Sequence, residues 1–309
     1  LAYVQDETKI TFPWSMIDKI TPRPDASVKK MLEDAGFTDT ESIVTSKNTY
    51  VAPFVNAEEA QYLVIENAFP NGRPALENAG VMFTSRETVE KVERMKVCTC
   101  LNPLHTALAV YGCLLGYTKI SDEMKDADLV KLVEIIGYKE GLPVVTDPGI
   151  LSPKKFIDEV LQIRVPNPFM PDTPQRIACD TSQKLSIRFG ETIKEYMASS
   201  ELDVKSLKFI PMVQAGWCRY LLGVDDELNA FTVSPDPMYE ELAGKLAGVK
   251  VGESCDVHAV LSPILSDAKI FGVNLYEAGL GEYVESIFAE LIAGKGAVRE
   301  TLKRHLAEA

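Results

Sequence analysis

Lysine, asparagine and histidine stand close together in one apolar stretch of an otherwise acidic chain. Residues 95–117 read MKVCTCLNPLHTALAVYGCLLGY, which places Lys96, Asn102 and His105 within ten positions. A lysine amine that is partly buried gives up its proton more readily and can act as a general base. An asparagine amide in a helix can donate a hydrogen bond to an oxyanion. These residue types therefore indicate a site for proton transfer beside a developing negative charge.

Each of the three residues also has a purely structural interpretation. A lysine in an apolar helix can lie at the helix edge with its ammonium group in solvent. A helical asparagine can bind a neighbouring main-chain carbonyl, and a lone buried histidine is most often part of the packing. The three side chains together are less easily explained by packing than any one of them alone.

The secondary structure predicted for the chain changes from strands to helices near residue 85. Before it, short stretches at 8–20, 49–55, 61–66 and 80–84 predict strands. From Ser85 onwards apolar residues recur at helical spacing, and prolines punctuate the connections. The predicted fold class is therefore mainly α, a multi-helix domain with a small β-containing N-terminal segment. We expect helices near residues 86–116, 121–137, 152–164, 173–198, 202–222, 236–246, 253–266, 281–294 and 296–308.

Composition and charge narrow the class of protein. The chain has 309 residues, 46% of them hydrophobic, which is enough for one large domain or two modest ones. The net charge of −13 argues against nucleic-acid binding, and no apolar run predicts a membrane span. No signal peptide is evident and the six cysteines lack C-x-x-C spacing. We therefore expect a cytoplasmic protein with free thiols and no metal.

Five stretches of the chain match, in combination, one family pattern. They are the Lys96–Asn102–His105 stretch, FPWSMIDKITP at 12–22, VIEN at 64–67 with GRP at 72–74, RIACDTSQK at 176–184 and AGWCRYL at 215–221. Together they resemble the polyol-specific long-chain dehydrogenases, a family that includes mannitol 2-dehydrogenase, fructuronate reductase and tagaturonate reductase. The resemblance extends over nearly the whole chain.

The resemblance implies an architecture in which an N-terminal Rossmann-type domain precedes a mostly helical one, with the active site between them. The sequence contains no G-x-G-x-x-G fingerprint and starts just before the F-P-x-S-M segment. We therefore expect residues 1–24 to be the tail end of the cofactor domain and 25–309 to be the substrate-binding and catalytic domain. On this hypothesis the N-terminal Rossmann domain of the same protein is absent from this chain and would be its partner. The fragment alone would then be inactive.

The resemblance also implies a role for each site residue. Lys96 would be the general base, Asn102 would polarise the carbonyl or alkoxide oxygen, and His105 would bind a neighbouring hydroxyl. Arg176 and Lys184 would bind the substrate's polar chain or a carboxylate, although without the resemblance they are equally well an exposed, solvated pair. The implied cofactor is NAD or NADP, bound mainly by the absent domain, and no metal is required.

The implied reaction interconverts a polyol or aldonate with a ketose or keto-uronate. Mannitol, mannonate and altronate all remain possible substrates, and the Arg176 and Lys184 pair favours a sugar acid. The alternative hypothesis is a non-catalytic helical interaction domain derived from this family.

Two positions depart from the family pattern. Five residues, 97–101, separate Lys96 from Asn102 where the family has four. On a regular helix Lys96 and His105 would then lie about 180° apart, whereas one residue fewer would give about 80°. We therefore predict a π-bulge or kink between Lys96 and Pro103, since proline removes a main-chain donor. The second departure is Trp14, which stands where relatives such as mannitol dehydrogenase carry asparagine.

Overall fold

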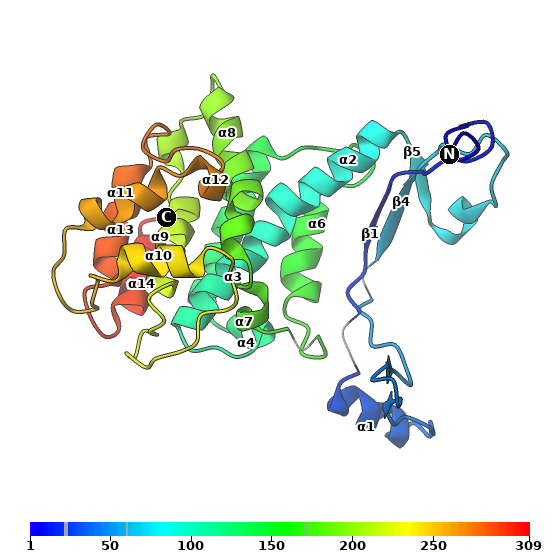
Figure 1. The fold of residues 1–309 in the computed structure, drawn as a ribbon, viewed down its shortest axis with the longest axis horizontal. Coiled ribbons are helices and arrows are strands. Elements are labelled where there is room, and N and C mark those ends of the chain that lie inside the picture. Colours follow the sequence, from blue (N-terminus) through cyan, green and yellow to red (C-terminus); the bar gives the residue numbers. More distant parts are fainter. Residues whose placement is uncertain (22–23, 60, 171) are drawn as a thin grey trace. The chain divides into compact units, whose positions relative to one another are not determined.

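The chain folds into two compact units. The structure, a computed structural model, describes residues 1–21, 24–59, 61–170 and 172–309 (Figure 1). The first unit runs from Leu1 to Glu93 and takes in two short later segments that begin at Asp147 and Asn167. The second unit contains the rest of the chain from Arg94. The predicted stiff connector at 21–24 lies partly outside the described residues, since 22 and 23 are not among them.

The first unit is built on a small mixed sheet with the strand order β1-β4-β5. Strand β1 pairs antiparallel with β4, and β4 pairs parallel with β5. Val64 on β4 packs with Val89 and Val92 of helix α2, which closes one face of the sheet. The elements of this unit are β1 (Ser15–Asp18), α1 (Ala26–Asp34), β2 (Ile43–Val44), β3 (Tyr50–Val51), β4 (Tyr62–Glu66), η1 (Leu76–Ala79), β5 (Met82–Thr84) and most of α2 (Arg86–Met95).

The expectation of a mainly helical chain without an N-terminal domain is wrong. Residues 1–93 form a compact N-terminal domain with its own sheet and its own apolar core, rather than a short β-containing segment. Strands of three to five residues, read one at a time, do not reveal that they meet in one sheet closed by α2. The boundary between domains that we drew at residues 24 and 25 stays a prediction.

The second unit is helical and surrounds α3, which is buried along nearly its whole length. Helices α5, α7 and α9 pack directly on α3 (Figure 1). Its α-helices are α3 (Asn102–Leu114), α4 (Ile120–Glu123), α5 (Ala127–Glu134), α6 (Pro153–Glu159), α7 (Pro174–Ile177), α8 (Glu191–Ala198), α9 (Phe209–Tyr220), α10 (Tyr239–Leu246), α11 (Val257–Leu265), α12 (Ala268–Phe271), α13 (Gly281–Leu291) and α14 (Ala297–Ala307). Single turns of other helix types join them: the π-helices η2 (Lys96–Cys100), η3 (Ile135–Gly141), η5 (Val160–Arg164) and η7 (Ser186–Gly190), and the 3₁₀ helices η4 (Leu142–Val144), η6 (Thr181–Gln183) and η8 (Val204–Ser206).

The predicted bulge between Lys96 and Pro103 is confirmed. Residues Lys96–Cys100 form a π-helical turn, in which the main-chain N–H of Leu101 donates to the carbonyl of Lys96 at 3.1 Å. Such a turn takes up one extra residue and so turns the helix back by about 100°. Pro103 stands at the start of α3, where its missing N–H costs no helical hydrogen bond. The departure in spacing is therefore accommodated by the backbone.

The long helix expected at residues 173–198 is interrupted. Asp180 has a φ of 52°, in the left-handed region, and separates α7 from η6. The carboxylate of Asp236 accepts hydrogen bonds from the main-chain N–H of Ser182 at 2.8 Å and from its hydroxyl at 2.5 Å. This contact across 54 residues bends the chain, so Arg176 and Lys184 do not share one helix face.

Two buried carboxylates cap helices that are distant in sequence. Glu140 accepts hydrogen bonds from the first main-chain N–H groups of α9, those of Phe209 and Ile210, each at 2.8 Å. Asp226 does the same for α14, accepting from Val298 at 2.8 Å and from Arg299 at 3.0 Å. A carboxylate at a helix N-terminus satisfies donors that have no partner within the helix. These caps hold the helices that surround α3.

The helical stretch Arg86–Leu114, which includes η2, is long and apolar enough by composition to cross a membrane. In the structure 78% of its most apolar window is buried within the protein, as in a core helix.

Candidate functional site

The first turn of α3 carries two of the predicted site residues. Asn102 and His105 are both half-buried, although most of α3 is fully covered. The side-chain oxygen of Asn102 is buried and has no hydrogen-bond partner in the described part of the chain. An amide in this state is available to a ligand hydroxyl. Lys96, in the preceding π-turn, is half-buried as well.

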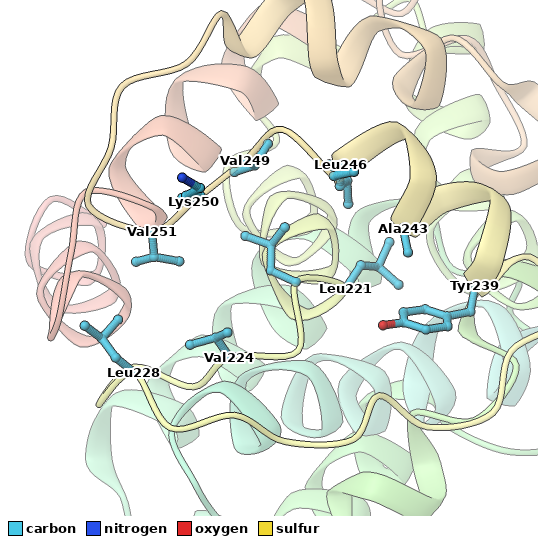
Figure 2. A pocket seen from close by; sticks show the side chains of 11 residues that line it. Leu221, Val224, Leu228, Tyr239, Ala243, Leu246, Val249, Lys250 and Val251 are labelled. Carbon is cyan, nitrogen blue, oxygen red and sulfur yellow. The ribbon is translucent and has the colours of Figure 1, made fainter.

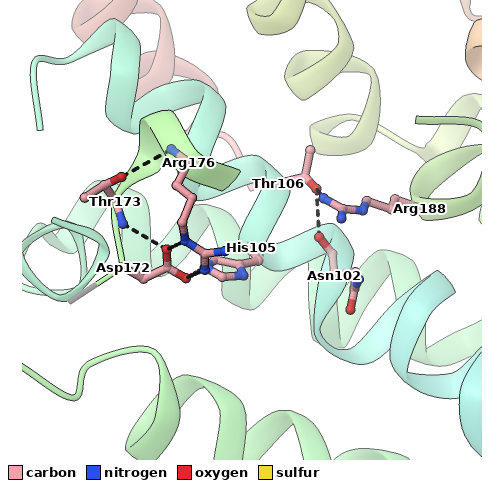
Figure 3. A network of polar contacts seen from close by, with 7 residues as sticks. All are labelled: Asn102, His105, Thr106, Asp172, Thr173, Arg176 and Arg188. Carbon is pink, nitrogen blue, oxygen red and sulfur yellow. Dashed lines mark hydrogen bonds and ion pairs between the residues drawn. The ribbon is translucent and has the colours of Figure 1, made fainter. Parts of the chain in front are cut away.

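Asp172 joins His105 to Arg176 (Figure 3). Its carboxylate receives two hydrogen bonds from Arg176, from Nε at 2.7 Å and from Nη2 at 2.6 Å. The same carboxylate lies 3.3 Å from Nε2 of His105. The structure therefore brings His105 and Arg176 together, although they are distant in sequence.

The charge on Asp172 is stabilised by these partners. Burial by itself raises the pKa of Asp172, but the hydrogen bonds from His105 and Arg176 outweigh burial and lower it to about 2. The same contact with Asp172 raises the pKa of Arg176. The carboxylate is thus ionised throughout the neutral range. Our sequence analysis did not identify Asp172, although its spacing of four residues before Arg176 is the one at which helical ion pairs form.

Lys184 lies outside this network. Its ammonium group donates to the main-chain carbonyl of Cys179 at 2.5 Å. Burial, followed by the positive charge of Arg188, lowers the pKa of Lys184. The expectation that Lys184 and Arg176 both bind the substrate stays a prediction.

Arg188 is a second residue that the sequence analysis missed. Its Nη1 donates to the hydroxyl of Thr106 at 2.6 Å, and that hydroxyl donates to the main-chain carbonyl of Asn102 at 2.8 Å. Figure 3 shows Arg188 reaching the first turn of α3, where Asn102 lies. Arg188 belongs to the π-turn η7, which packs against η2. The sequence signal was its position four residues after Lys184, which we did not use.

Trp14 belongs to the N-terminal unit. Its main-chain N–H donates to the carboxylate of Glu66 at 2.9 Å, and the guanidinium of Arg86 lies 4.7 Å from the centre of its ring. The contact with Arg86 is a cation–π interaction on a half-exposed surface. Within the first unit, Trp14 therefore has a packing role.

A separate apolar pocket, about 480 Å³ in volume, lies between the end of α9, helix α10 and residues 249–251 (Figure 2). Leu221, Leu246 and Val249 are among its lining residues, and none of the predicted site residues contributes to it. Because this lining offers few polar groups, we do not place a hydroxyl-rich substrate there.

In the described ranges no group of three His, Cys, Asp or Glu side chains could hold a metal ion. The residues described also include no glycine-rich turn between a strand and a helix that would fit a dinucleotide pyrophosphate. No cofactor-binding residues are therefore assigned.

Most of the chain matches one family model. The model for the mannitol dehydrogenase C-terminal domain matches residues 88–287. The chain belongs to this family.

Individual relatives agree with this assignment. D-mannonate oxidoreductase of Thermotoga maritima is 60% identical over 301 residues, which cover 96% of this chain and 55% of the relative. Mannitol 2-dehydrogenase of Pseudomonas fluorescens, solved as a ternary complex with NAD and D-mannitol, is 25% identical with a TM-score of 0.73. A substrate-free D-sorbitol dehydrogenase is 26% identical with a TM-score of 0.76, over 96% of this chain and 55% of that one.

The match to the mannitol 2-dehydrogenase covers 100% of this chain and 56% of the solved one. It therefore includes the N-terminal unit, which is further reason to reject the expected absence of an N-terminal domain. The chain spans about half the length of the relatives it matches.

Proposed function

We propose that this protein is an NAD(P)-dependent oxidoreductase that interconverts a polyol or aldonate with the corresponding ketose or keto-uronate. The observation that carries the proposal is the meeting of His105 and Arg176 on Asp172, with Asn102 on the same helical turn as His105 and its buried amide oxygen without a partner among the described residues. The alternative of a non-catalytic helical domain gives no reason for these polar groups to meet near the first turn of α3.

In the proposed reaction each residue acts on the substrate oxygen atoms. Lys96 takes the proton from the hydroxyl that is oxidised, and the Asn102 amide binds the same oxygen as negative charge develops on it. His105 binds a neighbouring hydroxyl, while Arg176 and Lys184 bind the polar chain. The hydride chemistry belongs to the nicotinamide cofactor when it is bound. NAD and NADP are both proposed, since the solved relative named above binds NAD and no residue described here selects between them.

We propose that the substrate is a sugar acid of the mannonate and fructuronate type. The relative that is 60% identical is named for D-mannonate, and positively charged side chains border the site. Among the described residues none of the six cysteines forms a disulfide, which favours a reducing compartment, and we propose the cytoplasm as the location.

The proposal is tested by assaying the full-length protein on D-mannonate, D-altronate and D-mannitol, each with NAD and with NADP. We expect oxidation, with the highest kcat/KM on D-mannonate. Activity on D-mannitol alone would overturn the sugar-acid proposal, and no oxidation of any of the three would overturn the proposed function.

A further inference from the structure

Arg188 is a half-buried cation that has no acidic partner in the part of the chain that the structure describes. Among the described residues its guanidinium makes one hydrogen bond, to the hydroxyl of Thr106. Burial lowers its pKa to about 10, and no nearby carboxylate opposes that effect. A guanidinium carries five N–H donors, so most of those on Arg188 are not used by a described residue.

Arg219 and Arg299, two other arginines of the second unit, show what a satisfied guanidinium looks like here. Arg219 is fully buried, and its donors bind the main-chain carbonyls of Leu291, Val224 and Asp225. Arg299 forms ion pairs of 2.6 and 2.8 Å with two aspartates, Asp126 and Asp128. A buried cation without such partners is costly, unless a ligand supplies the missing negative charge.

The unused donors of Arg188 lie beside the proposed site. Thr106, which holds Arg188, is one helical turn after Asn102 and donates to its main-chain carbonyl. One turn is about 5.4 Å along the helix axis. Lys184 lies four residues before Arg188, and the charge of Arg188 acts on it. The guanidinium of Arg188 is thus held by a residue one helical turn from Asn102, whose amide we propose binds the reacting oxygen.

We propose that Arg188 binds the carboxylate of the sugar-acid substrate and thereby selects an aldonate over a neutral polyol. Thr106 holds Nη1 in place, and the remaining N–H groups of the planar guanidinium fit the two oxygens of a carboxylate. Lys184 adds positive charge to the same site. This inference rests on the proposed function and adds to it the residue that determines substrate class.

The test compares Arg188→Gln with the unchanged protein on D-mannonate and on D-mannitol. We expect kcat/KM for D-mannonate to fall about 10- to 100-fold, the loss expected for a charge-assisted hydrogen bond, while kcat/KM for D-mannitol changes less than about threefold. Arg188→Lys keeps the positive charge but not the planar guanidinium. We expect its kcat/KM for D-mannonate to lie between that of the unchanged protein and that of Arg188→Gln. Arg94→Gln is the matched control, because Arg94 is exposed and already paired with Glu191 at 3.1 Å.

Calorimetric titration with D-mannonate separates this inference from the proposed function. If the protein binds D-mannonate without oxidising it, the proposed function fails, and loss of that binding in Arg188→Gln still supports the carboxylate site. Equal losses on D-mannonate and D-mannitol in Arg188→Gln would show a structural role and overturn the inference. Unchanged D-mannonate binding in Arg188→Gln would overturn it as well.

Discussion

At the scale of single residues, the site depends on polar groups that are held by other polar groups. Asp172 binds Arg176 through two hydrogen bonds and lies against His105, so three side chains restrict one another's positions. Such mutual restraint is what a binding site needs if it is to meet a substrate without rearrangement. Lys96 differs from them because its placement follows from the π-turn in the backbone.

Lys96→Ala tests the proposed general base. We expect kcat to fall by a factor of about 100 or more with a smaller change in KM, because proton transfer is lost while substrate contacts remain. The measurement is steady-state oxidation of D-mannonate. Lys91→Ala is the matched control, since Lys91 is exposed on α2 and pairs with Glu87 at 2.7 Å. Comparable losses in the two variants would contradict the role of Lys96.

Asp172→Asn tests the stabilisation by the Asp172 carboxylate. The pKa of Asp172 is lowered from 3.8 to about 2 in the folded protein, so its contribution is fully present above pH 3.8 and is lost as the pH falls through 2. We expect the variant to lose about 1 kcal/mol of unfolding free energy at pH 7, less than the full pKa shift implies, because solvent screens the largely exposed Arg176. The deficit should shrink towards pH 2, as measured by urea unfolding.

The control for this change is Asp122→Asn. Asp122 pairs with Lys125 at 2.7 Å on the surface, where such pairs contribute little. A deficit in Asp172→Asn that is the same at pH 7 and pH 2 would show that the ionised state is not the source of the stabilisation.

At the scale of elements, α3 and α4 pack closely where Gly112 meets Glu123. This packing limits the size of the side chain at position 112 and the protonation state of Glu123. The carboxyl group of Glu123, the last residue of α4, lies against Gly112 of α3. Both oxygens of Glu123 lack a hydrogen-bond partner in the described ranges, and burial raises the pKa of Glu123 to about 9, assisted by the charges of Asp126 and Asp172. Glu123 is thus protonated at neutral pH.

Gly112→Ala tests this packing. A methyl group at Gly112 would lie 2.0 Å from Oε1 of Glu123, so the buried side chain of Glu123 must move to a new position. We expect the variant to lose about 1–3 kcal/mol of unfolding free energy, the range for overpacking. Gly244→Ala in α10 is the matched control, because nothing lies within 4 Å of the added atom, and it should be neutral or stabilising. Equal changes in unfolding free energy in Gly112→Ala and Gly244→Ala would contradict the close approach of Glu123 to Gly112.

Glu123→Gln tests the protonation of this acid. Between about pH 4.5 and 9 the folded protein keeps a proton on Glu123 that the unfolded chain has lost. The unfolding free energy therefore falls as pH rises across this range, by up to about 1.4 kcal/mol per pH unit from this group. Since glutamine does not titrate, the stability of the variant relative to the unchanged protein should rise from pH 5 to pH 8. A difference that is independent of pH would refute the raised pKa.

At the scale of the whole molecule, the sequence predicted the positions of helices and strands better than the way they assemble. Most helices after residue 85 lie where the periodicity placed them, because burial of one helix face imposes a pattern that spans many residues. The helix expected at 173–198 failed because a contact with Asp236, distant in sequence, interrupts it. The N-terminal domain was missed because its strands are too short to signal a shared sheet.

The sequence by itself determined the family, the mainly helical second unit and the residue types of the candidate site, since these depend on local spacing and on motifs. It also predicted the π-turn at Lys96, because one extra residue must be absorbed. Only the tertiary structure decided that His105 and Arg176 meet on Asp172, and that Arg188 reaches the first turn of α3. These contacts join segments about 70 to 80 residues apart, and no local pattern encodes a partner at that distance.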